Sequence, residues 1–173
     1  MNAIATALVV VALLGSALIA GVFFAFSSFV MKALARVPSQ EGIAAMQAIN
    51  VVVLRPSFLG VFIGTTVMSA LVAVLAIAGW GSPWAPLLLA GALFYIVGTY
   101  LVTAFGNVPL NDQLAAIPAN HPDANSVWAQ YLDRWTRLNT FRSLAATATS
   151  LLFTLGLLQS GAAGSGGTHL LSN

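Results

Sequence analysis

The stretch AIATALVVVALLGSALIAGVFFAFSSFVM, residues 3–31, contains no charged side chain. A helix of about 20 apolar residues spans the hydrocarbon core of a bilayer, and this stretch exceeds that length. No Lys or Arg precedes it, so the positively charged beginning of a cleavable secretory signal is missing. The sequence therefore predicts a retained transmembrane helix over residues 3–31.

Three further apolar stretches, at about 58–79, 86–106 and 143–159, have the composition of membrane spans, the last near the lower length limit. Charged residues make up only 6% of the chain, whereas a soluble domain carries about 25% to face water. We predict an all-α integral membrane four-helix bundle, with an additional amphipathic cytoplasmic helix between spans 1 and 2. A cytoplasmic extension should lengthen span 4. The bundle forms one domain over 1–160, and 161–173 is a flexible Gly/Ser-rich tail.

The basic residues lie only in the connections between spans 1 and 2 and between spans 3 and 4. By the positive-inside rule, both connections are cytoplasmic and both termini lie outside. We expect the membrane to be a bacterial inner membrane, with the termini in the periplasm. These side chains are too dispersed to neutralise a run of phosphates, so nucleic acid is not a predicted partner. They are Lys32, Arg36, Arg55, Arg134, Arg137 and Arg142.

Metal, haem and thiol chemistry are disfavoured by the residue types present. There are no cysteines, and the two histidines, His121 and His169, fall in a Pro-rich loop and the Gly-rich tail. No histidine stands at metal-ligand spacing from an acidic residue. We therefore predict no metal and no cofactor. The acidic residues are Glu41, Asp112, Asp123 and Asp133.

The segment after Pro38 is amphipathic. At 100° per residue, Gln47 and Asn50 fall within an apolar stripe that includes Ile43 and Met46. Two interpretations are open: these amides form hydrogen bonds within the bundle, or they line a pocket at the membrane edge. Buried polar groups near a bilayer require partners and are often functional.

A second two-faced segment precedes span 4. One face, an arc of about 80°, carries aromatic residues, an amide and a guanidinium. Packing or interfacial anchoring is one interpretation of the aromatic stripe, and a substrate-binding wall is the other. The residues on this face are Trp128, Tyr131, Trp135, Asn139 and Arg142.

Arg142 stands at the entrance to span 4, where a charge facing lipid is costly. We expect it to reach the headgroups or to point inward to a partner, with Asp112 and the loop amides as candidates. Asn107 and Asn111 flank Pro109 just before Asp112. This NVPLND stretch predicts either a simple end to span 3, because proline breaks helices, or a rigid polar corner at the cytoplasmic mouth of the bundle.

Small residues and tryptophans predict further packing features. The Gly60-x-x-x-Gly64 pattern allows close helix contacts, within this bundle or, as a weaker alternative, in a homodimer. Trp80 and Trp84 flank the turn between spans 2 and 3 and suit the membrane–water interface.

Four segments carry a family resemblance: GVFFAFSSFVMKAL (21–34), GIAAMQAINVVVLRPSFLGVFIGT (42–65), TAFGNVPLNDQLA (103–115) and WAQYLDRWTRLNTFR (128–142). With them the chain resembles the anthrone-oxygenase-like family of small four-span membrane proteins. The resemblance implies a monooxygenase-type oxidoreductase that converts an anthrone to an anthraquinone with dioxygen as co-substrate. Most members of that family are uncharacterised.

The residues suggest roles in such chemistry. Trp128, Tyr131 and Trp135 would form a slot for a flat, lipophilic substrate. Arg142 and Asn139 would stabilise an enolate oxygen, and Asp112 would act as base. The further predicted substrate-binding residues are Asn107, Asn111, Gln47 and Asn50.

Two other functions stay open. The chain fits a non-catalytic membrane subunit whose partners are neighbouring subunits and the lipid bilayer. A small transporter is less favoured, because no charged residue stands at mid-span.

Overall fold

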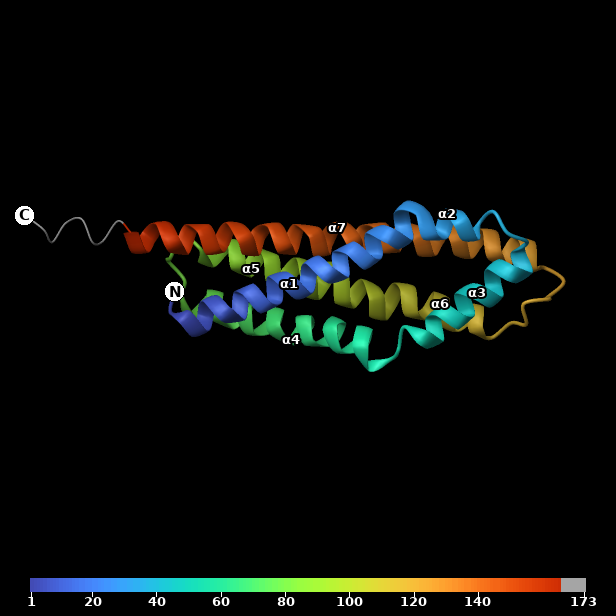
Figure 1. Ribbon diagram of the computed structural model, residues 1–173, viewed down its shortest axis with the longest axis horizontal. Helices are drawn as coiled ribbons and strands as arrows, with labels where there is room; N and C mark the ends of the chain where they lie inside the picture. The colour runs from blue at the N-terminus through green and yellow to red at the C-terminus, as the bar shows by residue number, and fades with distance from the viewer. Residues whose placement is uncertain (166–173) are drawn as a thin grey trace, which may run out of the picture.

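The computed structural model describes residues 1–165. Within them, four helical segments are long and apolar enough to cross a membrane: Ala3–Leu34, Pro56–Ala78, Ala85–Ala115 and Ala124–Gly161. They lie side by side in an elongated bundle (Figure 1). The prediction of an all-α membrane bundle with four spans is confirmed.

The elements include three π-helical segments, labelled η, that interrupt the α-helices. In chain order they are α1 (Ala3–Ala25), η1 (Phe26–Val30), α2 (Met31–Leu34), α3 (Ser39–Val52), α4 (Pro56–Ala78), α5 (Ala85–Leu93), η2 (Phe94–Leu101), η3 (Thr103–Asn107), α6 (Val108–Ala115) and α7 (Ala124–Ser165). The additional helix predicted between the first two spans is α3.

Span 4 belongs to α7, a single helix of 42 residues. At 1.5 Å per residue it is about 63 Å long, roughly twice the hydrocarbon thickness of a bilayer. The predicted extension of span 4 is confirmed. The first residues of the predicted tail, 161–165, are helical and belong to α7, which differs from the prediction. Residues 166–173, and with them His169, lie outside the described residues.

The four long segments form a closed ring in which each packs against two neighbours. Helix α1 packs against α7 and α4, and α5 packs against the same two helices. Small residues allow these contacts, since a Cβ at Gly15 would lie 2.1 Å from the Thr65 hydroxyl oxygen. A Cβ at Gly98 would lie 2.6 Å from Ala145 Cβ. Close backbone approach is therefore part of how the bundle packs.

Two sequence predictions about packing are wrong. Gly60 and Gly64 do not pack within the bundle, because a Cβ at either position would meet no atom within 4 Å. Trp84 is buried in the core and does not lie at the membrane–water interface, whereas Trp80 is exposed as predicted. In both cases the residue type suits two environments, and the packing of the bundle decided which one the residue occupies.

Pro109 does not end span 3. The chain passes from η3 into α6, where Pro109 occupies the first turn, a position at which its missing N–H is tolerated. The preceding turn is π-helical, because the Val108 N–H donates to the Thr103 carbonyl five residues earlier. Asn107 provides no helix cap, and its Nδ2 donates instead to the Trp135 carbonyl oxygen at 3.2 Å.

The exposed basic side chains gather at one end of the bundle. That end is formed by α2, α3 and the first turns of α7, opposite the N-terminus (Figure 1). The charge asymmetry read from the sequence is therefore present in three dimensions. The exposed basic residues are Lys32, Arg36, Arg55, Arg134 and Arg137.

Candidate functional site

Arg142 is buried inside the bundle, with 5% of its surface exposed. Its Nε and Nη2 donate to Asn139 Oδ1 at 3.1 and 2.8 Å, and its Nη1 donates to Thr103 Oγ1 at 3.1 Å. The guanidinium carbon lies 3.8 Å from the ring centroid of Phe23 and 5.1 Å from that of Trp135. Cation–π contacts stabilise a desolvated guanidinium. They hold this side chain inward, away from the headgroups.

Asn139 orients the guanidinium and joins two helices. Its Oδ1 accepts from Arg142, while its Nδ2 donates to the Phe23 carbonyl and to Ser27 Oγ, each at 2.7 Å. The side chain is fully buried. Because both ends of the amide are occupied, Asn139 is placed to position Arg142 and not to contact a ligand.

All three π-helical segments make hydrogen bonds to the same two turns of α7, residues 135–142. Ser27 in η1 accepts from Asn139, and Thr99 in η2 donates to the Arg142 carbonyl at 3.2 Å. Thr103 and Asn107 in η3 bond the Arg142 side chain and the Trp135 carbonyl. Short π-helical insertions are frequent at functional sites, and here they surround one buried cation.

No carboxylate in the described part of the chain neutralises Arg142. Within residues 1–165 the one ion pair joins Arg137 to Asp133 on the surface. The predicted pairing of Arg142 with Asp112 is therefore wrong: Asp112 is exposed at the rim of the cavity that Arg142 lines. Burying an unpaired charge costs several kcal/mol even after local relaxation. The site thus has a positive potential that would be complemented by an anionic ligand.

A cavity of about 420 Å³ lies beside Arg142. Its volume is within the range of about 300–1,000 Å³ that is typical of small-molecule sites. Its walls come from α1, α3, α4, α6, α7 and the π-helical segments, and most of the lining side chains are apolar. The aromatic residues of the lining are Phe23, Phe26, Phe58, Phe62, Tyr100 and Trp135.

Six of the ten site residues predicted from the sequence line this cavity: Arg142, Asp112, Trp135, Asn111, Gln47 and Asn50. Gln47 also has a packing role, because its Nε2 donates to the Leu114 and Ile117 carbonyls at 2.8 and 3.0 Å. Asn50 differs, since its Nδ2 is buried and has no hydrogen-bond partner. A buried donor without a partner is costly. The Nδ2 atom is covered by its neighbours, so a ligand would reach it only after the Asn50 side chain turns toward the cavity.

The remaining four, Trp128, Tyr131, Asn107 and Asn139, are not part of the cavity lining. Trp128 and Tyr131 stack with their ring centroids 5.6 Å apart, and Tyr131 stacks on Trp135 at 6.2 Å. The rings therefore fill the space between one another and leave no slot there. A role in substrate binding for Trp128, Tyr131 and Asn107 stays a prediction, as does a catalytic role for Asn139.

Asn111 fixes the stack beside the cavity. Its Oδ1 accepts hydrogen bonds from the Tyr131 hydroxyl at 2.9 Å and from Trp135 Nε1 at 2.8 Å. Trp135 can then present one side of its ring to the Arg142 guanidinium. The polar corner that the sequence suggested around Asn111 is thus built by contacts between α6 and α7.

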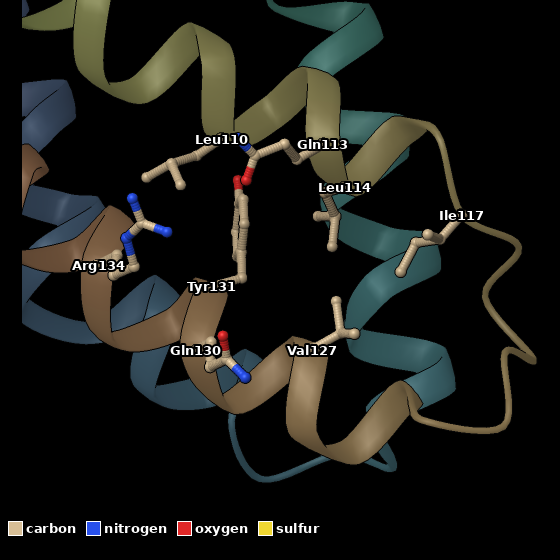
Figure 2. A pocket seen from close by; sticks show the side chains of 8 residues that line it. All are labelled: Leu110, Gln113, Leu114, Ile117, Val127, Gln130, Tyr131 and Arg134. Carbon is tan, nitrogen blue, oxygen red and sulfur yellow. The ribbon is translucent and has the colours of Figure 1, made fainter.

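A smaller pocket of about 280 Å³ lies between α6 and α7 near the loop that joins them. Figure 2 shows the Tyr131 side chain extending from α7 toward α6, with Arg134 on one side and Leu114 on the other. Arg134 is exposed. This pocket therefore lacks the buried cation of the larger cavity.

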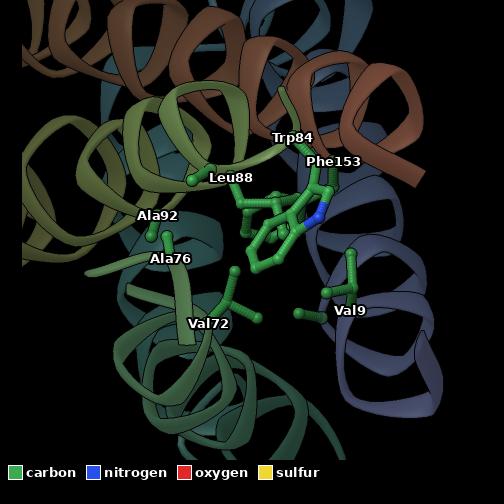
Figure 3. Close-up of a cluster of buried hydrophobic side chains, with 9 residues drawn as sticks. Val9, Val72, Ala76, Trp84, Leu88, Ala92 and Phe153 are labelled. Carbon is green, nitrogen blue, oxygen red and sulfur yellow. The ribbon is translucent and has the colours of Figure 1, made fainter. Parts of the chain in front are cut away.

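The opposite end of the bundle contains a cluster of buried apolar side chains. Trp84, Leu88 and Phe153 meet Val9 and Val72 there in one apolar cluster (Figure 3). Phe153 is fully buried. The cavity beside Arg142 lies away from this cluster, toward the end where the exposed basic residues gather.

Sequence reasoning missed the phenylalanine walls. Phe23 and Phe26 come from the first span, and Phe58 and Phe62 stack on each other from α4 with centroids 6.1 Å apart. Apolar residues in a span have no polar neighbour to single them out. The signal was their i, i+3 and i, i+4 spacing, which places each pair on one helix face.

The family of the chain follows from a comparison with known protein families. Residues 58–152, more than half of the 173, match the family described as anthrone oxygenase. The chain belongs to the anthrone oxygenase family. The matched region includes Asp112, Trp135 and Arg142, while α1 and α3, which complete the cavity, precede it. No curated protein and no solved structure matches the chain.

Proposed function

We propose that this integral membrane protein is an oxygenase that oxidises a lipophilic, anthrone-like aromatic with dioxygen and without a bound metal or organic cofactor. One observation carries the proposal: a buried guanidinium without a carboxylate partner forms part of the wall of an apolar, aromatic cavity. Family membership supports the choice of substrate class.

For the oxidation of an anthrone, the protein has to bind the substrate, supply a base and stabilise the enolate anion. The benzylic C–H of an anthrone is acidic because its loss gives an enolate with an aromatic central ring. The enolate is electron-rich and reacts with dioxygen, which is the oxidant. One anthrone and one dioxygen give one anthraquinone and one water, as the benzylic carbon loses two hydrogens and gains one oxygen. The oxidant thus comes from the co-substrate.

Arg142 supplies the electrostatic part of this reaction. Its guanidinium stabilises the enolate oxygen as negative charge develops there, and the low-polarity surroundings strengthen that interaction. Asn139 keeps the guanidinium in place through two hydrogen bonds. Asn50 lines the same cavity, and its unpaired Nδ2 would be a second donor to another oxygen of the substrate once the side chain turns toward the ligand.

Asp112 is the proposed base. It lines the cavity and is also exposed, so its carboxylate can take the benzylic proton and exchange it with water at the rim. The aromatic walls formed by Phe23, Phe58 and Phe62 enclose the flat rings and exclude water from the reacting carbon. We place this end of the bundle on the cytoplasmic side, because the basic residues gather there.

Oxygen consumption by purified protein in detergent tests the proposal. With 1,8-dihydroxyanthrone as substrate, the rate should exceed uncatalysed autoxidation. Arg142→Gln should lower kcat by about 10²–10³-fold, the effect expected for loss of one oxyanion donor. Arg137→Gln is the matched control, since it removes an exposed guanidinium from the same helix.

Asp112→Asn tests the base. It should lower kcat by about 10²-fold or more, while Asp123→Asn, which changes an exposed carboxylate in the loop before α7, should have no effect. A wild-type rate equal to autoxidation would refute the oxygenase proposal and favour a non-catalytic subunit. Full activity in both Arg142→Gln and Asp112→Asn would refute the assigned roles.

A further inference from the structure

The residues that line the large cavity fall into two groups by exposure. Phe62 and Arg142 are each 5% exposed and form its inner part. In contrast, Leu54 is 63% exposed, Leu59 37% and Ile63 40%, although each also lines the cavity. A side chain that is both exposed and part of the lining stands at the mouth. The mouth of this cavity is therefore apolar.

The mouth lies between two spans. One edge is formed by the end of α3, its connection to α4 and the first two turns of α4, through Val51, Leu54, Leu59 and Ile63. The other edge is formed by η3 and the start of α6, where Val108 is exposed. Exposed apolar side chains on membrane-spanning helices face lipid hydrocarbon. Leu59, Ile63 and Val108 belong to such helices, whereas Val51 and Leu54 lie between spans. The part of the mouth between α4 and the η3–α6 segment consequently opens sideways to the bilayer.

A polar edge limits the mouth on one side. Asp112, one turn along α6 from Val108, is exposed and also belongs to the lining. The opening thus runs from a lipid-facing apolar margin to a carboxylate near the water boundary. An amphipathic molecule at the membrane interface has this same arrangement of apolar body and polar end.

We infer that the ligand of this site is a flat apolar acid that enters from within the bilayer, through the mouth between α4 and the η3–α6 segment. The inference rests on the proposed function for its assignment of the cavity as the substrate site. A neutral acid dissolved in the bilayer passes Leu59 and Ile63 without losing hydration. Only the oxygen of the acid has to reach the inner part of the cavity, beside the uncompensated Arg142 guanidinium. The positive charge there favours the deprotonated form of the acid.

The absence of native cysteines makes the mouth easy to obstruct. Ile63→Cys and Leu59→Cys, each reacted with a bulky maleimide, would place an obstruction at the mouth. Ile77→Cys is the matched control, because Ile77 is 61% exposed on the same helix and does not line the cavity. Each variant is measured before and after reaction, so that a folding defect is distinguished from obstruction.

The probe is 1,8-dihydroxyanthraquinone, added by rapid mixing to phosphatidylcholine vesicles that contain the protein, and its association is followed through quenching of tryptophan fluorescence. This quinone cannot undergo the proposed oxidation, so binding is measured apart from catalysis. Labelling at Ile63→Cys or Leu59→Cys should slow association by at least tenfold, and labelling at Ile77→Cys should leave it unchanged.

Association that is equally fast after labelling at either mouth position would overturn the inference, and so would failure of the unlabelled protein to bind the quinone. Oxygen consumption with the anthrone is measured in parallel. Obstructed binding without any catalysis would support the lateral mouth and refute the oxygenase. Catalysis that labelling does not slow would support the oxygenase and refute the lateral mouth.

Discussion

Asn139→Asp tests whether the uncompensated charge of Arg142 is the functional element of the site. The change preserves the size of the side chain and keeps an oxygen 2.8 and 3.1 Å from Arg142 Nη2 and Nε. It converts a neutral acceptor into a carboxylate, so that Arg142 gains the partner it lacks. The guanidinium stays in place, and only the net charge of the site changes.

The magnitude follows from Coulomb's law. Two unit charges about 3 Å apart attract by roughly 5–6 kcal/mol at an effective dielectric constant of about 20. The new carboxylate would therefore offset most of the attraction between Arg142 and a bound enolate. Each 1.4 kcal/mol corresponds to a factor of ten. We expect kcat with an anthrone to fall by at least about 10²-fold, the lower end of the effect of losing one oxyanion donor.

The fold should tolerate this substitution. The Phe23 carbonyl loses the hydrogen bond from Asn139 Nδ2, at a cost of about 1–3 kcal/mol. The Ser27 hydroxyl can rotate to donate to the new carboxylate, and the ion pair with Arg142 offsets part of the loss. Unfolding in SDS should therefore shift only slightly, which separates a change in function from misfolding.

The assay combines anthrone-dependent oxygen consumption with binding of 1,8-dihydroxyanthraquinone. Asn125→Asp is the matched control, because it makes the same chemical change at an exposed position of α7. If folded Asn139→Asp protein has wild-type activity and quinone binding, the uncompensated charge of Arg142 is not what stabilises a bound anion. The proposed site chemistry would then be wrong.

Three further predictions concern the bundle. Gly98→Val should destabilise the protein by about 1–3 kcal/mol in SDS unfolding, because a Cβ at Gly98 would lie 2.6 Å from Ala145 Cβ, whereas Gly64→Val should be tolerated in open space. Equal midpoints for the two variants would contradict this packing. Phe153→Ala should lower stability by about 3–5 kcal/mol while quinone binding persists in the folded fraction, because Phe153 is fully buried far from the cavity. In intact spheroplasts, Asn2→Cys should react with a membrane-impermeant maleimide, and Asn120→Cys should react only after permeabilisation, because the termini are proposed to lie outside. The reverse labelling pattern would show that the proposed orientation is wrong.

Much of the site could be predicted from the helical spacing in the sequence. The stripe that joins Trp135, Asn139 and Arg142 follows from residue numbers alone, because one helix carries all three. Asn50 was singled out as an amide in an apolar stripe, and it lines the cavity. The sequence did not reveal that both the Oδ1 and the Nδ2 of Asn139 form hydrogen bonds within the protein and so hold Arg142 in place. The partners of Nδ2, Phe23 and Ser27, lie more than a hundred residues away in the sequence.

The π-helical segments were also beyond sequence reasoning. Nothing in the composition of Phe26–Val30 or Thr103–Asn107 distinguishes a π-helical turn from an α-helical one. The hydrogen bonds that these segments share with α7 join residues that lie far apart in the sequence. Pro109 misled the prediction for the same reason, because the π-helical turn before it allowed the helix to continue.

The sequence by itself determined that this protein lies in a membrane, with four spans and its basic residues at one end. These properties depend on hydrophobicity and charge, which are sums over residues and need no knowledge of contacts. Only the tertiary structure decided the partner of Arg142. The position of a guanidinium among an amide, a hydroxyl and two aromatic rings depends on how four helices rotate about their axes. That rotation is set by the packing of all four helices together, and it left the charge of Arg142 without a carboxylate at the wall of a cavity.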